Sequence, residues 1–491
     1  MRRYLRVVAI AAALALVVAA CGDDDDAAPT AAPTSSVASS TEAPPPDEPA
    51  DEPTDEPADE PTDEPADEPT DEPVESGVCD GVIDGPVTIT AWNHAGQGNE
   101  QDLVVQQVAD FNTTVGADLG VTVDVEFLPD GTYADAVQSA AAAGDLPDAL
   151  DFDGPFLYNY AWSQNLVPID TCVPADVRDN LLPSIVAQGT FNGQLYSVGT
   201  FESGLGIYAW RSVLEDNGIR IPTSPGDAWT ADEFDGILRT LQDAGFETPL
   251  DIKWYYGGGA TSEWYTYGFS PVIQSAGADL IDRGDYRSAE GVVNGPAAVG
   301  ALTTFQGWVD DGLVDLDSVD DLPFQEGTIP LSWVGHWLYS PYKEALGDDL
   351  VVVPLPDFGS GSATGQGSWN WGISSTAEEP DAVWAFYEYL LSDEQQERWS
   401  STIGAPPATL SAAADSALFG PGGDLEIYID QLASSSVPRP QTPAYPAITQ
   451  SFGAAFANIM LGADVQSELD RVAADIAEDL EANDFYPIGD G

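Results

Sequence analysis

Histidine and lysine are scarce in this chain, and their positions limit the chemistry it can perform. The two histidines are His94 and His336, so a metal site built from several histidines is excluded, and a histidine-based triad would have to use one of them. Neither lysine, Lys253 or Lys343, stands in a phosphate-binding loop, and no G-x-S-x-G motif occurs. Acidic pairs are too frequent to identify a site, although they leave a two-carboxylate glycosidase open. We therefore expect a protein that is not an enzyme and needs no cofactor.

The acid-rich stretch DALDFDG, residues 148–154, has some of the spacing of a calcium-binding loop. Its first ligand position would be Ala149 and its last would be Tyr160. A loop of that kind needs oxygen ligands at both ends, above all a carboxylate at the last position. We predict no metal site.

Cys21 stands at the end of the first apolar segment. Basic residues come first, and the apolar run from Val7 to Ala20 is shorter than the roughly 20 residues that span a bilayer. With small residues before the cysteine, the segment VAAC resembles a bacterial lipoprotein signal, in which the cysteine sulfur carries the lipid. We predict a signal peptide over residues 1–20 and lipidation of Cys21. The alternative is an ordinary secretory signal that is cut near an unrelated cysteine.

Residues 21–77 have the composition of a linker. The tetrapeptide Asp-Glu-Pro-Ala/Thr/Val begins at Asp47 and recurs up to Asp71. A proline at every fourth residue blocks helix and sheet, like charges repel each other, and few apolar side chains are present to bury. We predict an extended, acidic, disordered spacer between Cys21 and a folded part that begins at residue 78.

The charge of the chain argues against nucleic acid as a partner. The formal net charge is −69, and 63 of the 83 acidic residues lie after Gly77. Such a surface repels phosphate backbones. The remaining 414 residues are too many for one compact core and suit two lobes.

Cys79 and Cys172 are the cysteines of the folded part. Their spacing does not fit a zinc knuckle, and an exported chain meets oxidising conditions. Cys79 precedes the first predicted strand, so a disulfide with Cys172 would fix the start of the domain. We predict this disulfide, with two unpaired thiols as the alternative.

Strand and helix patterns alternate from residue 87 onward. Residues 87–92 and 121–128 read as strands around a helix over 100–115, and PDALDFDG reads as a third strand after a second helix. Further helices are predicted within 230–245, 294–312, 379–400 and 464–483. This β-α-β-α-β order predicts an α/β fold with a parallel sheet, where ligands sit at the carboxyl ends of the strands.

Nine segments follow one another in a recognisable order. The first are VTITAWNH, the helix and strand ending in VDVEFLP, LPDALDFDG with NLVPID, and FNGQLYSVGTFESGLGIYAWRSVLEDNGI. The later ones are AWTADEFDGILRTLQDAG, PFQEGTIPLSWVGHW, VVPLPDF, ISSTAEEPDAVWAFYEYLLSDEQQERW and RPQTPAYPAITQSFGAAFANIMLG. Together they resemble the extracellular solute-binding proteins of ABC importers, in the sugar-binding family that includes maltose-binding protein. WYYGGGATSEW and Tyr208-Ala209-Trp210 depart from the family pattern, which leaves the solute unidentified.

The resemblance implies a periplasmic-binding-protein-like fold of two lobes, each a mainly parallel sheet flanked by helices, joined by crossings near 197–201 and 365–370. Lobe 1 is expected over about 78–198 and 371–435, and lobe 2 over about 202–365 and 436–491.

The resemblance also implies which residues meet the solute between the lobes. Acids are expected at Asp153 and Glu202, stacking aromatics at Trp264 and Trp337, and a polar contact at His94. Trp333 would either contact the solute or support Trp337, and His336 would either contact it or support its loop. The predicted ligand-binding residues are His94, Asp153, Glu202, Trp254, Trp264, Trp333, His336, Trp337, Trp369 and Asn370.

The function implied is capture of an oligosaccharide or glycoside by a monomer held on the outer face of the cell membrane, or in the periplasm if there is an outer membrane. The partners would be the permease subunits of an ABC importer. A polyamine or other cation is an alternative solute, given the acidic cleft. An anchored enzyme acting on polysaccharide is a further alternative, which turnover by the purified protein would reveal.

Overall fold

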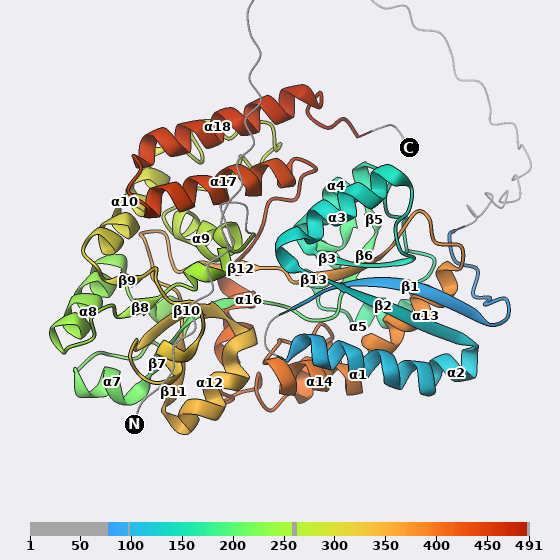
Figure 1. Ribbon diagram of the computed structural model, residues 1–491, viewed down its shortest axis with the longest axis horizontal. Helices are drawn as coiled ribbons and strands as arrows, with labels where there is room; N and C mark the ends of the chain where they lie inside the picture. The colour runs from blue at the N-terminus through green and yellow to red at the C-terminus, as the bar shows by residue number, and fades with distance from the viewer. Residues whose placement is uncertain (1–76, 97–98, 258–262, 489–491) are drawn as a thin grey trace, which may run out of the picture. The chain divides into compact units, whose positions relative to one another are not determined.

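The computed structural model describes residues 77–96, 99–257 and 263–488. Cys21 and the acidic repeats lie outside the described residues. The described chain forms two lobes, each built around a five-stranded mixed sheet with helices beside it (Figure 1). None of the helices in this part of the chain is both long and apolar enough to cross a membrane.

The first lobe contains the β-α-β-α-β unit that the sequence predicts. Its sheet has the order β2-β1-β3-β13-β6, in which β1 is parallel to β2 and β3, and β13 is antiparallel to β3 and β6. The strands are β1 (Val87–His94), β2 (Val121–Leu128), β3 (Ala149–Asp153), β6 (Ser197–Gly199) and β13 (Trp369–Ile373), with a small hairpin of β4 (Thr190–Phe191) and β5 (Gln194–Leu195). The helices are α1 (Glu100–Thr113), α2 (Val115–Leu119), α3 (Asp130–Ala143), η1 (Gly154–Phe156), α4 (Leu157–Trp162), α5 (Ala175–Asn180), α6 (Pro183–Gln188), α13 (Pro380–Leu390), α14 (Asp393–Ile403) and α15 (Leu410–Asp415).

Alternation along β3 explains why both faces of the first sheet are covered. Ala149 packs with the cluster that includes α1 and α13, whereas Leu150 and Phe152 pack with α3 and α4. Successive side chains of a strand point to opposite faces, so a strand that is apolar on both faces needs helices on both sides.

The second lobe has the sheet order β11-β7-β10-β8-β9. Here β8 is parallel to β9 and β10, and β7 is antiparallel to β10 and β11. The strands are β7 (Leu205–Trp210), β8 (Leu250–Asp251), β9 (Val314–Asp315), β10 (Leu331–Gly335) and β11 (Leu350–Val353). The helices are α7 (Arg211–Asp216), η2 (Pro225–Asp227), α8 (Ala231–Asp243), η3 (Trp254–Gly257), α9 (Glu263–Ser275), α10 (Pro296–Asp310), α11 (Leu322–Gln325), η4 (His336–Leu338), α12 (Tyr339–Leu346), η5 (Gly347–Asp349), α16 (Glu426–Ser434), α17 (Tyr445–Met460) and α18 (Val465–Ala482).

The chain crosses between the lobes three times within the described residues. It passes from β6 to β7, then from β12 (Thr364–Gln366) to β13, and finally from α15 to α16. Strand β12 pairs in parallel with β14 (Ser436–Pro438), so two connecting segments support each other. Leu425 and Tyr428 pack in the core of the second lobe. The expected range of 371–435 for the first lobe is therefore wrong at its end, because these apolar side chains are buried against β7.

One predicted helix is interrupted. The sequence pattern over 379–400 predicts a single helix, but the structure has α13 and α14 separated at Leu391 and Ser392. Ser392 has extended backbone angles, φ −64° and ψ 148°, and precedes the first residue of α14. The Ser392 side chain makes no capping hydrogen bond to α14, and its hydroxyl donates instead to the Tyr389 carbonyl of α13 at 2.7 Å.

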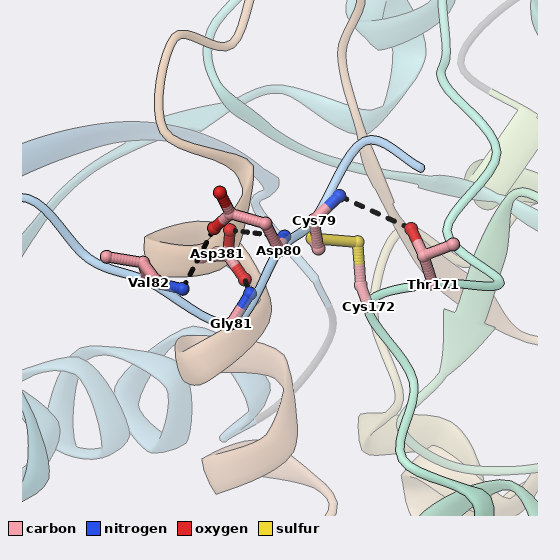
Figure 2. The surroundings of a disulfide bond; sticks show 7 residues. All are labelled: Cys79, Asp80, Gly81, Val82, Thr171, Cys172 and Asp381. Atoms are coloured by element: carbon pink, nitrogen blue, oxygen red, sulfur yellow. Dashed lines mark hydrogen bonds between the residues drawn. A yellow bond between two sulfur atoms is a disulfide. The ribbon is translucent and has the colours of Figure 1, made fainter. Parts of the chain in front are cut away.

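A disulfide fixes the first described residues to the first lobe. Cys79 and Cys172 are bonded, with their Cα atoms 5.0 Å apart. Beside the bond, the backbone N–H groups of Asp80 and Gly81 donate to the Asp381 carboxylate at the start of α13 (Figure 2). Three segments that are far apart in sequence therefore meet where the described chain begins.

The C-terminal segment returns from α18 to the first lobe. Asp484, Phe485 and Tyr486 all have positive φ, which costs energy in residues other than glycine and persists only where contacts hold it. The Tyr486 ring meets the edge of Trp162 of α4, and the Trp162 Nε1–H donates to the Pro487 carbonyl at 3.1 Å. This segment therefore links the end of α18 to α4 of the first lobe, in addition to the three crossings.

Candidate functional site

At the chain crossings, the ends of strands from one sheet face the ends of strands from the other. We call each of these strand-end sides an edge of its sheet. In the first lobe, β1 and β3 end at this edge and the antiparallel β13 begins there. In the second lobe, β8 and β10 end at the same crossings and β7 begins there. Ligands of α/β proteins bind beyond the carboxyl ends of parallel strands, so the candidate site lies between these two edges.

A buried arginine joins carboxylates from the two lobes at this place. Arg439, which follows β14, donates to both carboxylate oxygens of Asp153, at 2.6 and 2.5 Å. It also donates to Glu263, the first residue of α9, at 2.7 Å. The Arg439 side chain is 3% exposed, against 14% for Asp153 and 23% for Glu263. Asp153 is thus at the lobe interface, as predicted, but it already has a charged partner.

Glu263 is held by further groups of the second lobe. Tyr445 and Thr449, both of α17, donate their hydroxyl hydrogens to its carboxylate. Burial raises the pKa of Glu263, although the Arg439 guanidinium opposes that rise. The resulting cluster, which we call the Arg439 bridge, consists of Asp153, Arg439, Glu263 and Tyr445.

Aromatic rings of the second lobe continue from the Arg439 bridge. The Arg439 guanidinium lies 4.7 Å from the ring centre of Tyr267, and Tyr267 lies 6.3 Å from the partly exposed Trp337. Trp337 in turn meets Trp264 edge to face at 5.9 Å. The structure therefore brings Trp264 and Trp337 together, and Tyr267 connects them to Asp153.

Trp254 packs somewhat apart from that group. Its ring stacks on Tyr265 at 4.8 Å, and Tyr265 faces Phe456 of α17. Trp254 is partly exposed on η3, directly after the buried Lys253. It is connected to the second lobe's core and only indirectly to Trp337.

Trp369 is the aromatic residue that the first lobe supplies. It begins β13 directly opposite Asp153 in the sheet register and is partly exposed. His94, the last residue of β1, stacks on its ring with the centroids 3.5 Å apart. His94 is only 3% exposed, so the expectation that it contacts the solute is not met in this conformation, because the indole of Trp369 covers it.

Glu202 and Asn370 are fully buried in the crossings rather than exposed in the cleft. Glu202 accepts hydrogen bonds from the Gln188 side chain at 2.9 Å and from the Ser203 backbone N–H at 3.2 Å. Burial raises the pKa of Glu202. Asn370 donates to the Ser368 carbonyl at 3.1 Å. Both side chains are buried in this solute-free conformation, so their role as solute contacts stays a prediction.

His336 and Trp333 are also removed from the cleft. His336 is 1% exposed, with its ring against Phe201 of the first crossing and Nδ1 3.4 Å from the Ile403 carbonyl. Burial lowers the pKa of His336 to about 4. Trp333 packs in the core of the second lobe and donates its Nε1–H to the Gly268 carbonyl. Of the alternatives stated for these two residues, the supporting roles fit the structure.

Arg439, Glu263 and Tyr267 were missed by sequence reasoning. Arg439 lies 286 residues from Asp153 in sequence, and no local pattern connects them. The available signal was that Arg439 begins the RPQTPAY segment and is one of few basic residues in an acidic chain. A buried carboxylate needs a cation, and that requirement could have directed attention to it.

The site contains few features of a catalytic centre. No group of three or more histidine, cysteine, aspartate or glutamate side chains that could hold a metal ion is present in the described part of the chain. Beside Arg439 the lobes leave a cavity of about 10 Å³, lined by Gly154, Gln188 and Gln366 among others, which is room for one water molecule. A larger molecule could reach these groups only after the lobes move apart.

Solved structures of other proteins share this fold. Similarity extends over 81% of the chain and all of a cyclic α-maltosyl-1,6-maltose binding protein from Arthrobacter globiformis, with 22% identity and a TM-score of 0.65. An ABC substrate-binding protein from Listeria monocytogenes shows 18% identity and a TM-score of 0.68 over 81% of this chain and all of that one. The sugar-binding protein MalE from Xanthomonas citri shows 19% identity and a TM-score of 0.66 over 82% of this chain and all of that one. The fold is therefore the two-lobed MalE-like fold.

A family model gives the affiliation independently of these structures. The model of bacterial extracellular solute-binding proteins matches residues 106–419, which is more than half of the chain. The matched range begins in α1 and includes the second sheet, the first sheet apart from β1, the first two crossings and the Asp153 side of the Arg439 bridge. This chain belongs to the bacterial extracellular solute-binding protein family.

Proposed function

We propose that this protein binds a neutral sugar, an oligosaccharide or glycoside, between its lobes and delivers it to an ABC importer. One observation carries the proposal. Aromatic and polar groups form a continuous series across the lobe interface, in the order Trp369, Asp153, Arg439, Tyr267, Trp337 and Trp264.

This series has the composition that a sugar requires. Aromatic faces stack on the C–H surfaces of a sugar ring, and carboxylates and guanidinium groups pair with its hydroxyls. The solutes of similar proteins support the class: the Listeria protein is in complex with cycloalternan, a Thermotoga maritima protein holds maltose, and another protein of this fold holds mannotriose.

A polyamine or other cation suits the site less well. Such a solute needs carboxylates with charge to spare, but Asp153 and Glu263 are both paired with Arg439. Glu202 is fully buried and already accepts hydrogen bonds from Gln188 and from the Ser203 backbone N–H. The acidic composition of the chain therefore does not produce an acidic cleft at this point.

A thermal-shift screen over sugars, polyols, polyamines and amino acids tests the solute class. A solute that binds the folded state stabilises it by RT ln(1 + [L]/Kd), so a sugar that binds raises the melting temperature of the full chain. Stabilisation by polyamines alone, weakening as ionic strength rises, would support the cation instead.

Paired tryptophan variants test the location of the site. For a stabilising sugar, Trp337→Ala should weaken binding by about 1 to 3 kcal/mol, because an aromatic face is lost from the pocket. Trp210→Ala is the matched control, since Trp210 ends β7 at the opposite edge of the same sheet. Equal affinities of Trp337→Ala and wild type would show that the cleft is misplaced.

We also propose that lipid on Cys21 holds the protein on the outer face of the membrane. Support comes from the signal-like residues before Cys21 and from membership of an extracellular family. Labelled palmitate should be incorporated by wild type and by the Cys79→Ser/Cys172→Ser control, but not by Cys21→Ala. Membrane association of Cys21→Ala equal to that of wild type would refute the anchor.

The same sugar separates binding from catalysis. Incubated with the purified protein, it should be recovered unchanged, because the site offers hydrogen bonds and stacking but no evident acid–base pair. Release of shorter sugars, abolished by Asp153→Asn, would support the enzyme alternative.

A further inference from the structure

His94 is held in one orientation by two carboxylates from different elements. Its Nδ1 lies 2.5 Å from an Asp151 oxygen in β3, and its Nε2 lies 3.1 Å from a Glu100 oxygen at the start of α1. The His94 backbone N–H also donates to Asp151 at 3.2 Å. A carboxylate accepts hydrogen bonds, so two such partners match an imidazole that carries a proton on each nitrogen.

Among the described residues, the charged groups that act on the His94 ring are Asp151 and Glu100. The Asn93 side chain donates to the His94 carbonyl, and the Tyr133 hydroxyl of α3 donates to the Trp92 carbonyl at 3.3 Å. Burial lowers the pKa of His94, but the charges of Asp151 and Glu100 outweigh it and raise the pKa well above the ordinary value. The raised pKa and the two carboxylate partners both favour the protonated form of the ring.

The fixed imidazole ring lies flat against Trp369. The two ring planes differ by 6° and the centroids are 3.5 Å apart. Tyr133 packs against a second side of the Trp369 indole. The two rings are perpendicular, and their centroids are 5.6 Å apart. Hydrogen bonds in the imidazole plane define that plane, and stacking transfers its orientation to the indole.

We propose that His94, as an imidazolium, is the positioning residue for Trp369 and fixes the plane that this indole presents to the cleft. The inference rests on the proposed function only for what Trp369 meets there. Asp151 and Glu100 fix His94, His94 fixes Trp369, and Trp369 supplies the stacking surface of the first lobe. Under this proposal the buried carboxylates of Asp151 and Glu100 orient Trp369 through His94, in addition to any contribution to stability.

The test measures Trp369 in the full chain without any solute. The protein is labelled with 5-fluorotryptophan, and the Trp369 signal among the 13 tryptophans is assigned with Trp369→Phe. The fluorine shift of Trp369 should change with the same pH midpoint as the His94 imidazole. Its relaxation should show a fixed ring below that midpoint and a more mobile ring above it.

The chain contains its own control in the second histidine. His336 meets Trp337 at 5.5 Å with the rings 83° apart, so it does not stack. The Trp337 signal should stay constant over the pH range in which the Trp369 signal moves. An unchanged Trp369 shift or mobility across the His94 titration would overturn the inference.

A variant that keeps His94 adds a second measurement. Asp151→Asn removes one of the two charges that raise the pKa of His94, so the His94 midpoint should fall. The Trp369 midpoint should fall by the same amount, whereas separate movement of the two midpoints would contradict the inference. Failure of every sugar to bind would overturn the proposed function and leave these solute-free results unaffected.

Discussion

His94 and His336 are both buried, yet their surroundings shift their pKa values in opposite directions. His94 faces two carboxylates, which raise its pKa despite burial. His336 has one backbone carbonyl near Nδ1, and burial lowers its pKa to about 4. The difference comes from the partners and not from the degree of burial, because only a nearby opposite charge compensates a buried imidazolium.

We expect NMR titration of the imidazole signals to separate the two residues. The variants His94→Gln and His336→Asn assign the signals to the two residues. The His336 signals should titrate near pH 4, and the His94 signals above pH 6.5. Two midpoints near 6.5 would show that neither environment exists in solution.

The same asymmetry predicts how stability depends on pH. The folded-state pKa of His336 is lower than its unfolded value, so its contribution is complete above about pH 6.5 and is lost as pH falls towards about 4. Wild type should lose about 3 kcal/mol more than His336→Asn over that range, measured by urea unfolding. For His94 the sign is reversed, and its contribution is complete below about pH 6.5 and is lost as pH rises through the folded-state pKa. If the free energies of unfolding of wild type and His336→Asn decrease equally as the pH falls, the predicted contribution of His336 is excluded.

At this scale the sequence predicted positions better than contacts. The family resemblance implied that Asp153, Trp337 and Trp369 lie where the lobes meet, and in the structure Asp153 ends β3, Trp369 begins β13 and Trp337 follows β10. The stacking of His94 on Trp369 and the hydrogen bond from Gln188 to Glu202 join residues that are separated in sequence. Such contacts follow from the three-dimensional packing and leave no trace in local spacing.

Among the elements, strands and amphipathic helices were the most predictable. The strand expected over residues 121–128 is β2 with the same bounds, and α8 begins after Thr230, whose hydroxyl accepts from the Glu233 N–H. The interruption between α13 and α14 was missed because its apolar spacing continues through the break.

The disulfide is the element-scale contact with the largest expected effect. It closes a loop with a sequence separation of 93 residues, and a cross-link over such a loop reduces the entropy of the unfolded chain. Cys79→Ser/Cys172→Ser should lower the free energy of unfolding by roughly 4 to 5 kcal/mol in denaturant titrations. Cys21→Ser is the control with unchanged stability, and a double variant as stable as that control would contradict the prediction.

For the molecule as a whole, the Arg439 bridge connects the lobes without any solute. Arg439→Gln leaves Asp153 and Glu263 without their cation, and breaking a buried pair in this way costs roughly 3 to 5 kcal/mol. The solute-free variant should therefore be less stable and more open, with a larger radius of gyration in small-angle scattering than wild type. Adding Asp153→Asn to Arg439→Gln should recover part of both changes. An unchanged radius and stability would mean that the bridge does not hold the lobes together.

The junction at Cys79 also determines how a pull on the N-terminal part of the chain would be carried. Force arriving along that part meets a covalent bond to Cys172 and two hydrogen bonds to Asp381 before it reaches β1. The load is therefore shared among separate segments of the first lobe, and β1 is not peeled from its neighbours starting at Val87. The second lobe lies outside this load path, so a steady pull at the N-terminal side would neither drive nor resist the turning of one lobe against the other.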